Sequence, residues 1–316
     1  MSRYRTHLPQ LDDRIFIADS GMETTLIFHD GIDLPYFASF VLLEDAAGRA
    51  WLRDYFVQHI ALARAAGTGI VLETPTWRAS ADWGAKLGYD AARLAAVNRA
   101  SVAQLAELRE ELETPATPIV ISGNLGPRGD GYVAGRKMHI AEAQAYHAPQ
   151  IDTFAGSAAD LVSVFTMTYV EEAIGVARAA QVAGMPVAVS FTLETDGRLP
   201  SGMPLGEAIE AADAATGAYP AYYMINCAHP THFAHVLEDA RPWRARVRGV
   251  RANASKRSHA ELDEATELDP GNPDELASEY RELRTLLPRL AVVGGCCGTD
   301  HRHIGAVCER LVATAA

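Results

Sequence analysis

The feature that most constrains the fold is an eightfold alternation of short apolar segments with longer helical patterns. The apolar segments, rich in Val and Ile, span residues 15–21, 69–75, 118–126, 161–167, 186–194, 221–228, 247–255 and 290–298. Between them, Ala and Leu recur at helical spacing over residues 44–66, 91–112, 139–156, 170–183, 205–217, 231–240, 274–286 and 301–313. Such alternation is typical of a parallel sheet covered by crossover helices.

Eight strand–helix units in series predict an α/β fold, a single (β/α)8 (TIM) barrel. The alternative is an open doubly wound sheet, but its usual glycine-rich fingerprint after the first strand is absent. No linker rich in Pro, Gly and Ser divides the 316 residues, so we expect one barrel domain over residues 1–316. The irregular stretches 74–90, 126–138 and 253–273 each follow a strand, which places them at the C-terminal rim where barrel active sites are built.

Charge and hydropathy narrow the class of partner. The net charge is -12, which argues against nucleic acid or an anionic membrane and favours a small-molecule substrate. No apolar run approaches the ~18 residues of a membrane span. The first 21 residues lack the apolar core of a signal peptide, so a cytoplasmic location is expected. A homo-oligomer is compatible with the sequence.

Three cysteines lie at the ends of predicted strands that meet at the same rim. Cys227 lies at the end of the sixth strand, and Cys296 and Cys297 lie in a Gly-Gly-Cys-Cys-Gly run at the end of the eighth. Neighbouring strand residues point to opposite faces, so both can bind one ion only if the backbone leaves strand geometry, which the glycines permit. Three protein ligands with an open fourth position are the pattern of a catalytic zinc site.

Other interpretations of the thiols and of nearby residues remain open. Cys296 and Cys297 could be buried core cysteines that are adjacent by chance, or they could form a vicinal disulfide, although a reducing compartment favours the metal. Cys308, inside the last predicted helix, is interpreted as a core residue. His301 and His303 are interpreted as helix-start residues and Lys256 as part of a solvated loop.

A zinc ion with three thiolates is a weak Lewis acid, which suits it poorly to hydrolysis. It can still hold an incoming thiol as a nucleophilic thiolate. A sulfonium or quaternary ammonium donor would be attracted to that anionic site, and in-line methyl transfer then needs mainly alignment and desolvation. The residues therefore favour methylation of a small thiol.

The chain resembles, over nearly its whole length, the zinc-dependent homocysteine S-methyltransferases, including the betaine–homocysteine methyltransferase branch. The resemblance rests on the segments Asp19-Ser20-Gly21-Met22-Glu23-Thr24, Asn226-Cys227 and Gly294-Gly295-Cys296-Cys297-Gly298. It implies Zn²⁺ bound by Cys227, Cys296 and Cys297. It also implies that Asp19, Gly21 and Asn226 form part of the amino-acid pocket, although Asp19 could instead cap a helix and Asn226 could satisfy a loop.

Two positions depart from the family pattern. Ser20 stands where the family often has Gly, and Phe165 stands where the family usually places a Glu that binds the substrate ammonium. An unpaired buried ammonium is costly, so another carboxylate must supply the charge if homocysteine is the acceptor. The candidates are Glu23, which lies within the first-strand motif, Glu73 and Glu194, although each could instead be a solvated loop residue.

The function expected is zinc-dependent transfer of a methyl group from a sulfonium or betaine-type donor to a small thiol, homocysteine first, giving methionine. Alternatives are the same chemistry on another thiol or selenol, a corrinoid-protein donor, or a non-catalytic zinc- or thiol-binding barrel.

Overall fold

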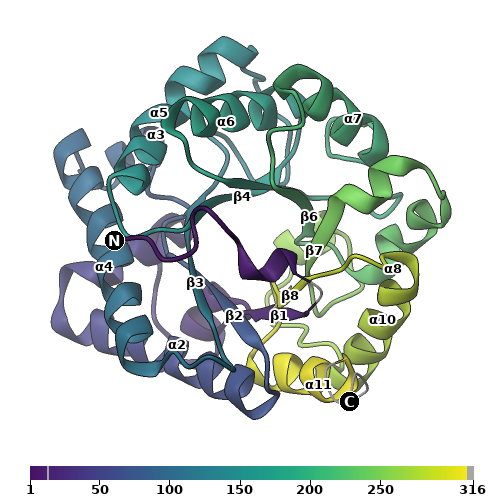
Figure 1. Ribbon diagram of the computed structural model, residues 1–316, viewed down its shortest axis with the longest axis horizontal. Coiled ribbons are helices and arrows are strands. Elements are labelled where there is room, and N and C mark those ends of the chain that lie inside the picture. Colours follow the sequence, from purple (N-terminus) through teal and green to yellow (C-terminus); the bar gives the residue numbers. More distant parts are fainter. Residues whose placement is uncertain (13, 312–316) are drawn as a thin grey trace.

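Eight parallel strands close into a barrel in the computed structural model, which describes residues 1–12 and 14–311 (Figure 1). The strands are β1 (Phe16–Ala18), β2 (Gly69–Glu73), β3 (Ile119–Leu125), β4 (Leu161–Met167), β5 (Val187–Phe191), β6 (Tyr222–Asn226), β7 (Val247–Ala252) and β8 (Val292–Gly295). Their order around the barrel follows the chain, and β8 pairs with β1. The eight predicted strands and the TIM barrel are confirmed.

Helices surround the barrel (Figure 1). They are α2 (Ala46–Ala65), α4 (Ala91–Leu112), α5 (Ile140–Ala155), α6 (Val170–Ala183), α7 (Leu205–Thr216), α8 (Pro230–Phe233), α10 (Pro273–Leu286) and α11 (His301–Leu311). Local sequence sets several of their ends. Asp45 and Asp90 accept hydrogen bonds from backbone N–H groups at the starts of α2 and α4. Gly184 and Gly217 end α6 and α7 in the left-handed conformation.

The structure differs from the predicted helices at the sixth unit. The helix expected over 231–240 is a single turn, α8, continued by a 3₁₀ segment at Ala234–Glu238. The break falls at Phe233, whose φ of -133° is outside the helical range. Residues 312 and 313 of the last predicted helix lie outside the described residues. The short helices α1 (Met22–Thr24), α3 (Ala81–Lys86) and α9 (His259–Asp263) were not predicted.

The apolar core has two parts. The larger lies between the sheet and the helices. The smaller fills the barrel interior with side chains that include Phe16, Val71, Val120 and Leu161. The interior is packed, so a substrate can enter only at the mouth above these layers.

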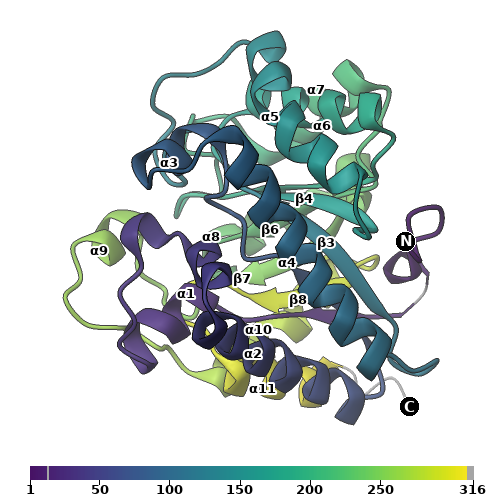
Figure 2. The same cartoon turned by 90° about the vertical axis from the view of Figure 1, so that its left-hand side faces the viewer.

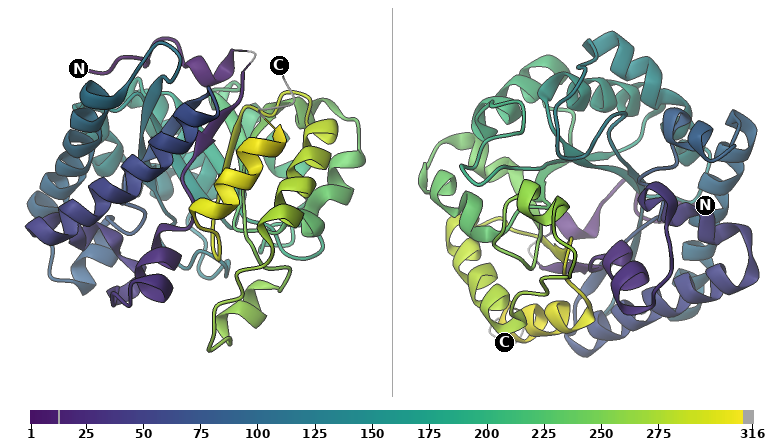
Figure 3. Two further views of the ribbon diagram at one scale, coloured as in Figure 1. Left: turned by 90° about the horizontal axis from the view of Figure 1, so that it is seen from below. Right: turned by 180° about the vertical axis from the view of Figure 1, so that it is seen from behind.

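The three irregular stretches predicted for the rim lie together at one end of the barrel. Figure 2 shows α3 and α9, which belong to two of them, at the end opposite the N-terminus. The right-hand view of Figure 3 shows that end face-on. The N-terminal segment covers the other end, where the backbone N–H groups of Arg3 and Tyr4 donate to Asp160 at 2.7 and 2.8 Å. Within the described residues, no helix is long and apolar enough to cross a membrane.

Candidate active site

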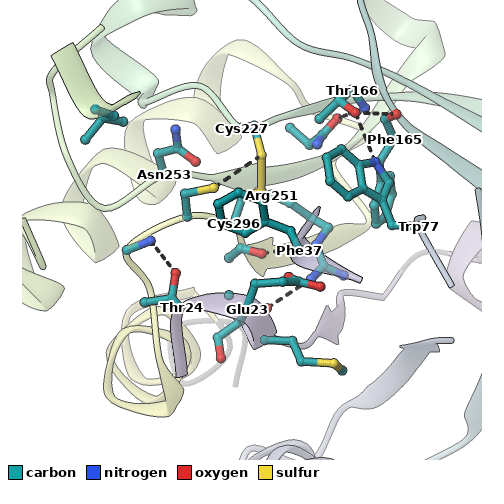
Figure 4. A pocket seen from close by; sticks show the side chains of 18 of the residues that line it. Glu23, Thr24, Phe37, Trp77, Phe165, Thr166, Cys227, Arg251, Asn253 and Cys296 are labelled. Carbon is teal, nitrogen blue, oxygen red and sulfur yellow. Dashed lines mark hydrogen bonds between the residues drawn. A yellow bond between two sulfur atoms is a disulfide. The ribbon is translucent and has the colours of Figure 1, made fainter. Parts of the chain in front are cut away.

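Three cysteine sulfurs meet at the mouth of the barrel. Those of Cys227, Cys296 and Cys297 all lie within 4.8 Å of one another. Cys227 and Cys296 form a disulfide, and Cys297 Sγ lies 3.9 Å from Cys227 Sγ (Figure 4). Four ligands around zinc at ~2.3 Å place neighbouring sulfurs about 3.8 Å apart, so the reduced cluster fits such an ion. No other group of three His, Cys, Asp or Glu in the described chain has this spacing.

The backbone leaves strand geometry where the thiols converge. β8 ends at Gly295, and the N–H of Cys296 donates to Ala252 O of β7 at 2.8 Å. Cys227, one residue beyond β6, has a φ of +54°, a left-handed conformation that is uncommon outside glycine. The vicinal disulfide considered above is not the one observed. The predicted departure from strand geometry is confirmed, because Cys296 and Cys297 lie in the turn after β8 and not in the strand.

Gly21 supports this turn. A Cβ on Gly21 would lie 2.5 Å from the carbonyl oxygen of Cys296. The N–H of Gly21 donates to Thr299 Oγ1 at 3.1 Å. Glycine is therefore required for the approach of the cysteine turn.

Asn226 connects the strand ends beneath the thiols. Its Oδ1 accepts hydrogen bonds from the N–H of Thr166 at 2.9 Å and from Ser190 Oγ at 2.6 Å. Thr166 has a φ of +55°, which is rare for a β-branched residue and typical of strain held at a functional site. The oxygen of Asn226 therefore stabilises the ends of β4 and β5, and Asn226 also lines the cavity.

Asp19, at the end of β1, is neutralised by an arginine. Arg251 Nη1 lies 2.6 Å from Asp19 Oδ1, and both side chains are buried. The other nitrogens of Arg251 donate to the carbonyl oxygens of Gly295 and Ser20 at 3.1 and 3.3 Å. The Phe165 ring lies against the same guanidinium, 5.1 Å from its carbon to the ring centroid. Asp19 is therefore the counter-charge of Arg251, and the Phe165 ring beside the guanidinium contributes no charge.

Two of the three candidate carboxylates line the cavity. Glu73 is buried and accepts a hydrogen bond from Ser163 Oγ at 3.1 Å, while its Oε2 has no partner among the described residues. Burial raises the pKa of Glu73 to about 7. Glu23 is half-buried, accepts from Ser39 Oγ at 2.9 Å, and has a pKa raised by desolvation. Glu194 is not among the lining residues.

Tyr132 was missed by the sequence analysis. Its hydroxyl donates to Cys227 Sγ at 3.6 Å, lies 3.5 Å from Cys297 Sγ, and its ring packs on His259 at 4.7 Å. Desolvation, with the nearby Cys297, raises the pKa of Tyr132 well above its usual value. The sequence feature that could have pointed to Tyr132 is its place as an aromatic residue in the glycine-rich stretch 126–138, which was already expected at the rim.

The residues set aside on sequence grounds lie outside the thiol cluster. His301 begins α11 and is exposed, and His303 is buried against Asp300. Lys256 is half exposed and pairs with Glu275. Cys308 is buried in α11. These interpretations are confirmed.

The thiols and carboxylates line one cavity of about 320 Å³. The fold and this cavity define a TIM-barrel protein with a thiol-rich small-molecule site at its mouth. The family model for homocysteine S-methyltransferases matches residues 16–311, so the chain belongs to that family and is a methyltransferase.

Solved structures agree on the fold. The homocysteine methyltransferase MmuM from Escherichia coli matches in its metallated form with 21% identity and a TM-score of 0.72. Its oxidized form matches with 22% identity and a TM-score of 0.74. Each match covers 95% of this chain and 97% of that one. No protein of curated function matches the chain significantly.

Proposed function

We propose that this protein is a zinc-dependent homocysteine S-methyltransferase that takes the methyl group from a sulfonium or betaine-type donor and forms methionine. The observation that carries the proposal is the cluster of Cys227, Cys296 and Cys297 inside the small-molecule cavity of a member of this family. The three thiols would hold the ion once the Cys227–Cys296 disulfide is reduced. Bound zinc supplies a site at which an incoming thiol stays deprotonated at neutral pH.

The chain's own residues would order the site around the thiols. The Tyr132 hydroxyl can donate to a cysteine sulfur, which delocalises negative charge and fixes the side-chain positions. Trp77, whose Nε1 donates to Thr166 Oγ1 at 3.1 Å, and Phe165 give the cavity apolar walls (Figure 4). Such walls exclude water, which favours transfer of a methyl cation equivalent from the sulfonium sulfur or quaternary nitrogen of the donor to the acceptor thiolate over hydrolysis of the donor.

For the acceptor, we propose contacts with four residues named from the sequence: Asp19, Gly21, Glu23 and Asn226. All four line the cavity. Since Arg251 neutralises Asp19, the charge lost at Phe165 must come from elsewhere. Glu73 is suited to it: Ser163, its hydrogen-bond donor, lies two residues before Phe165 on the same inward face of β4, and Glu73 Oε2 has no partner in the described structure. An ammonium at Glu73 would also favour its ionised form.

The function is tested on reduced, zinc-loaded protein. Homocysteine is supplied with S-methylmethionine, S-adenosylmethionine, glycine betaine or a methylated corrinoid, and methionine is measured by mass spectrometry. Turnover with a sulfonium or betaine supports the proposal. Full zinc occupancy without methionine from any donor refutes it and leaves a non-catalytic barrel. Turnover with the corrinoid alone would overturn the donor class.

The role of Glu73 has a test of its own. Glu73→Gln should raise the KM for homocysteine about 10- to 100-fold, the loss expected for a charged hydrogen bond. The KM for 4-mercaptobutyrate, which is homocysteine without its amino group, should stay unchanged. Glu194→Gln, outside the cavity, is the matched control. Equal KM values for homocysteine in both variants would refute the assignment.

A further inference from the structure

Arg78 is a buried arginine on the wall of the active-site cavity. It lies in the loop after β2, is 5% exposed, and lines the same cavity as the three thiols. Its guanidinium carbon lies 3.8 Å from the ring centroids of both Trp77 and Trp83. Two indole rings at that distance fix the plane of the guanidinium, so its donors are held in one orientation.

The charge of Arg78 has no partner within the described chain. Arg78 Nη1 donates to the carbonyl oxygen of Gly129 at 3.1 Å, and Nε is buried without an acceptor. No carboxylate of a described residue forms an ion pair with it. Asp130, the acidic residue with the largest influence on Arg78, already accepts the backbone N–H groups of Tyr132 and Val133. Desolvation lowers the pKa of Arg78 to about 10, so it stays charged at neutral pH.

The other two buried arginines of the described chain show what such a residue normally has. Arg109 pairs with Asp160 at 2.6 Å and Arg251 with Asp19 at 2.6 Å. A buried guanidinium without a counter-ion is unfavourable. An anion that enters the cavity would remove that penalty, and a planar carboxylate matches the two-donor edge of the guanidinium.

We propose that Arg78 binds the carboxylate of a substrate and so selects carboxylate-bearing molecules for this site. The inference deepens the proposed function, because both homocysteine and the donors S-methylmethionine and glycine betaine carry that group. Two residues then bind the two charged groups: Arg78 binds the carboxylate, and Glu73 binds the ammonium of the acceptor. Both groups belong to one molecule if Arg78 binds the acceptor, and to two molecules if Arg78 binds the donor.

The test measures equilibrium binding by calorimetry on the zinc-loaded protein, so that it does not depend on turnover. The acceptor arm compares homocysteine with 3-aminopropanethiol, its analogue without the carboxylate. The donor arm compares S-methylmethionine and glycine betaine with trimethylsulfonium and tetramethylammonium, which have none. Arg78→Met keeps the length of the side chain between the two indoles but removes its charge.

Arg78→Met should weaken carboxylate-bearing ligands in at least one arm about 10- to 100-fold and leave the ligands without carboxylate unchanged. The arm that responds identifies the source of the carboxylate. Arg93→Met is the matched control: Arg93 stacks on Tyr89 at 3.9 Å but lies outside the cavity, and it should change neither arm. Unchanged binding of every carboxylate ligand in Arg78→Met, or equal weakening of ligands with and without the group, would overturn the inference.

A second variant covers the case in which Arg78→Met does not fold. Arg78→Lys retains the charge but loses the two-donor edge, so it should weaken carboxylate-bearing ligands relative to wild type and change no ligand without a carboxylate; unchanged binding of every carboxylate ligand would overturn the inference.

Measurement of methionine formation separates this result from the proposed function. If wild-type protein discriminates by carboxylate but forms no methionine, the proposed function fails and the role of Arg78 stands. If methionine forms and the dissociation constants of the carboxylate ligands are identical in wild type and Arg78→Met, the role of Arg78 is refuted and the proposed function stands.

Discussion

Replacing Asp19 by Asn should destabilise the protein through the arginine that it leaves behind. The pair with Arg251 has an N–O distance of 2.6 Å, and both side chains are buried. Removal of one partner of a buried ion pair costs about 3–5 kcal/mol, because the remaining charge stays out of water. Arg251 keeps its hydrogen bonds to the carbonyl oxygens of Gly295 and Ser20, so we expect the lower end, about 3 kcal/mol.

The measurement is thermal unfolding followed by circular dichroism, on metal-free and metal-loaded protein. In a domain of this size 1 kcal/mol moves Tm by roughly 2 °C, so Asp19→Asn should lower Tm by about 6 °C. Arg251→Met removes the charge at similar length. The variant that combines Asp19→Asn with Arg251→Met buries no unpaired charge. Its loss in the free energy of unfolding should therefore be about 2 kcal/mol smaller than the sum of the two single losses.

Additive single effects would refute this account of the ion pair, and so would a Tm within about 1 °C of wild type for Asp19→Asn. In the second case Arg251 would have found another counter-charge, and Glu73 is the nearest candidate because it already interacts electrostatically with Arg251. Glu73→Gln added to Asp19→Asn identifies that outcome, because the fall in Tm should then exceed the sum of the falls in the two single variants.

Three further predictions concern other parts of the molecule. Cys296→Ser should drop zinc well below one ion per chain by elemental analysis and abolish activity, whereas Cys308→Ser should keep both; full zinc retention in Cys296→Ser contradicts the ligand assignment. The pKa of Glu73 is raised from 4.5 to about 7 in the folded state. The contribution of the protonated Glu73 side chain to the free energy of unfolding is therefore complete below pH 4.5, and it falls by up to about 3 kcal/mol as the pH rises to 7. Thermal unfolding from pH 4 to 8 should show less of this decline in Glu73→Gln, and an identical profile would argue against it. Arg109→Met leaves Asp160 buried without its guanidinium and should cost about 3 kcal/mol in thermal unfolding, with a loss under about 1 kcal/mol counting against it.

The fold was predictable because its signal is repeated and local. Each strand is a short Val- and Ile-rich run and each helix has its own spacing, so one misjudged boundary, such as the short α8, leaves the barrel unchanged. The meeting of Cys227 with Cys296 and Cys297 was predictable for a related reason: parallel strands of a barrel end at one rim. Position along a strand was enough to bring residues about 70 apart in sequence to one place.

Residues whose roles depend on the direction of a side chain were not predictable. Tyr132 and Arg78 lie in loops, where no periodicity indicates which side chain turns toward the cavity. Arg251 lies in a strand, but its pairing with Asp19 crosses β8, which separates β7 from β1. Local patterns carry no information on such a contact, which is set by packing over the whole barrel.

The charges in the cavity limit what the acceptor can be. Phe165 removes a carboxylate from the wall, and Arg251 neutralises Asp19, so two sources of negative charge expected from the family pattern are not free. Glu23 also lines the cavity, but its carboxylate already accepts a hydrogen bond from Ser39. The groups with unpaired atoms are Glu73, through Oε2, and Arg78, through Nε. If both bind homocysteine, the losses in Glu73→Gln and Arg78→Met should each appear in its dissociation constant, and 4-mercaptobutyrate should respond to Arg78→Met only. If Arg78 binds the donor instead, homocysteine responds to Glu73→Gln alone, because the two anchors then belong to different molecules.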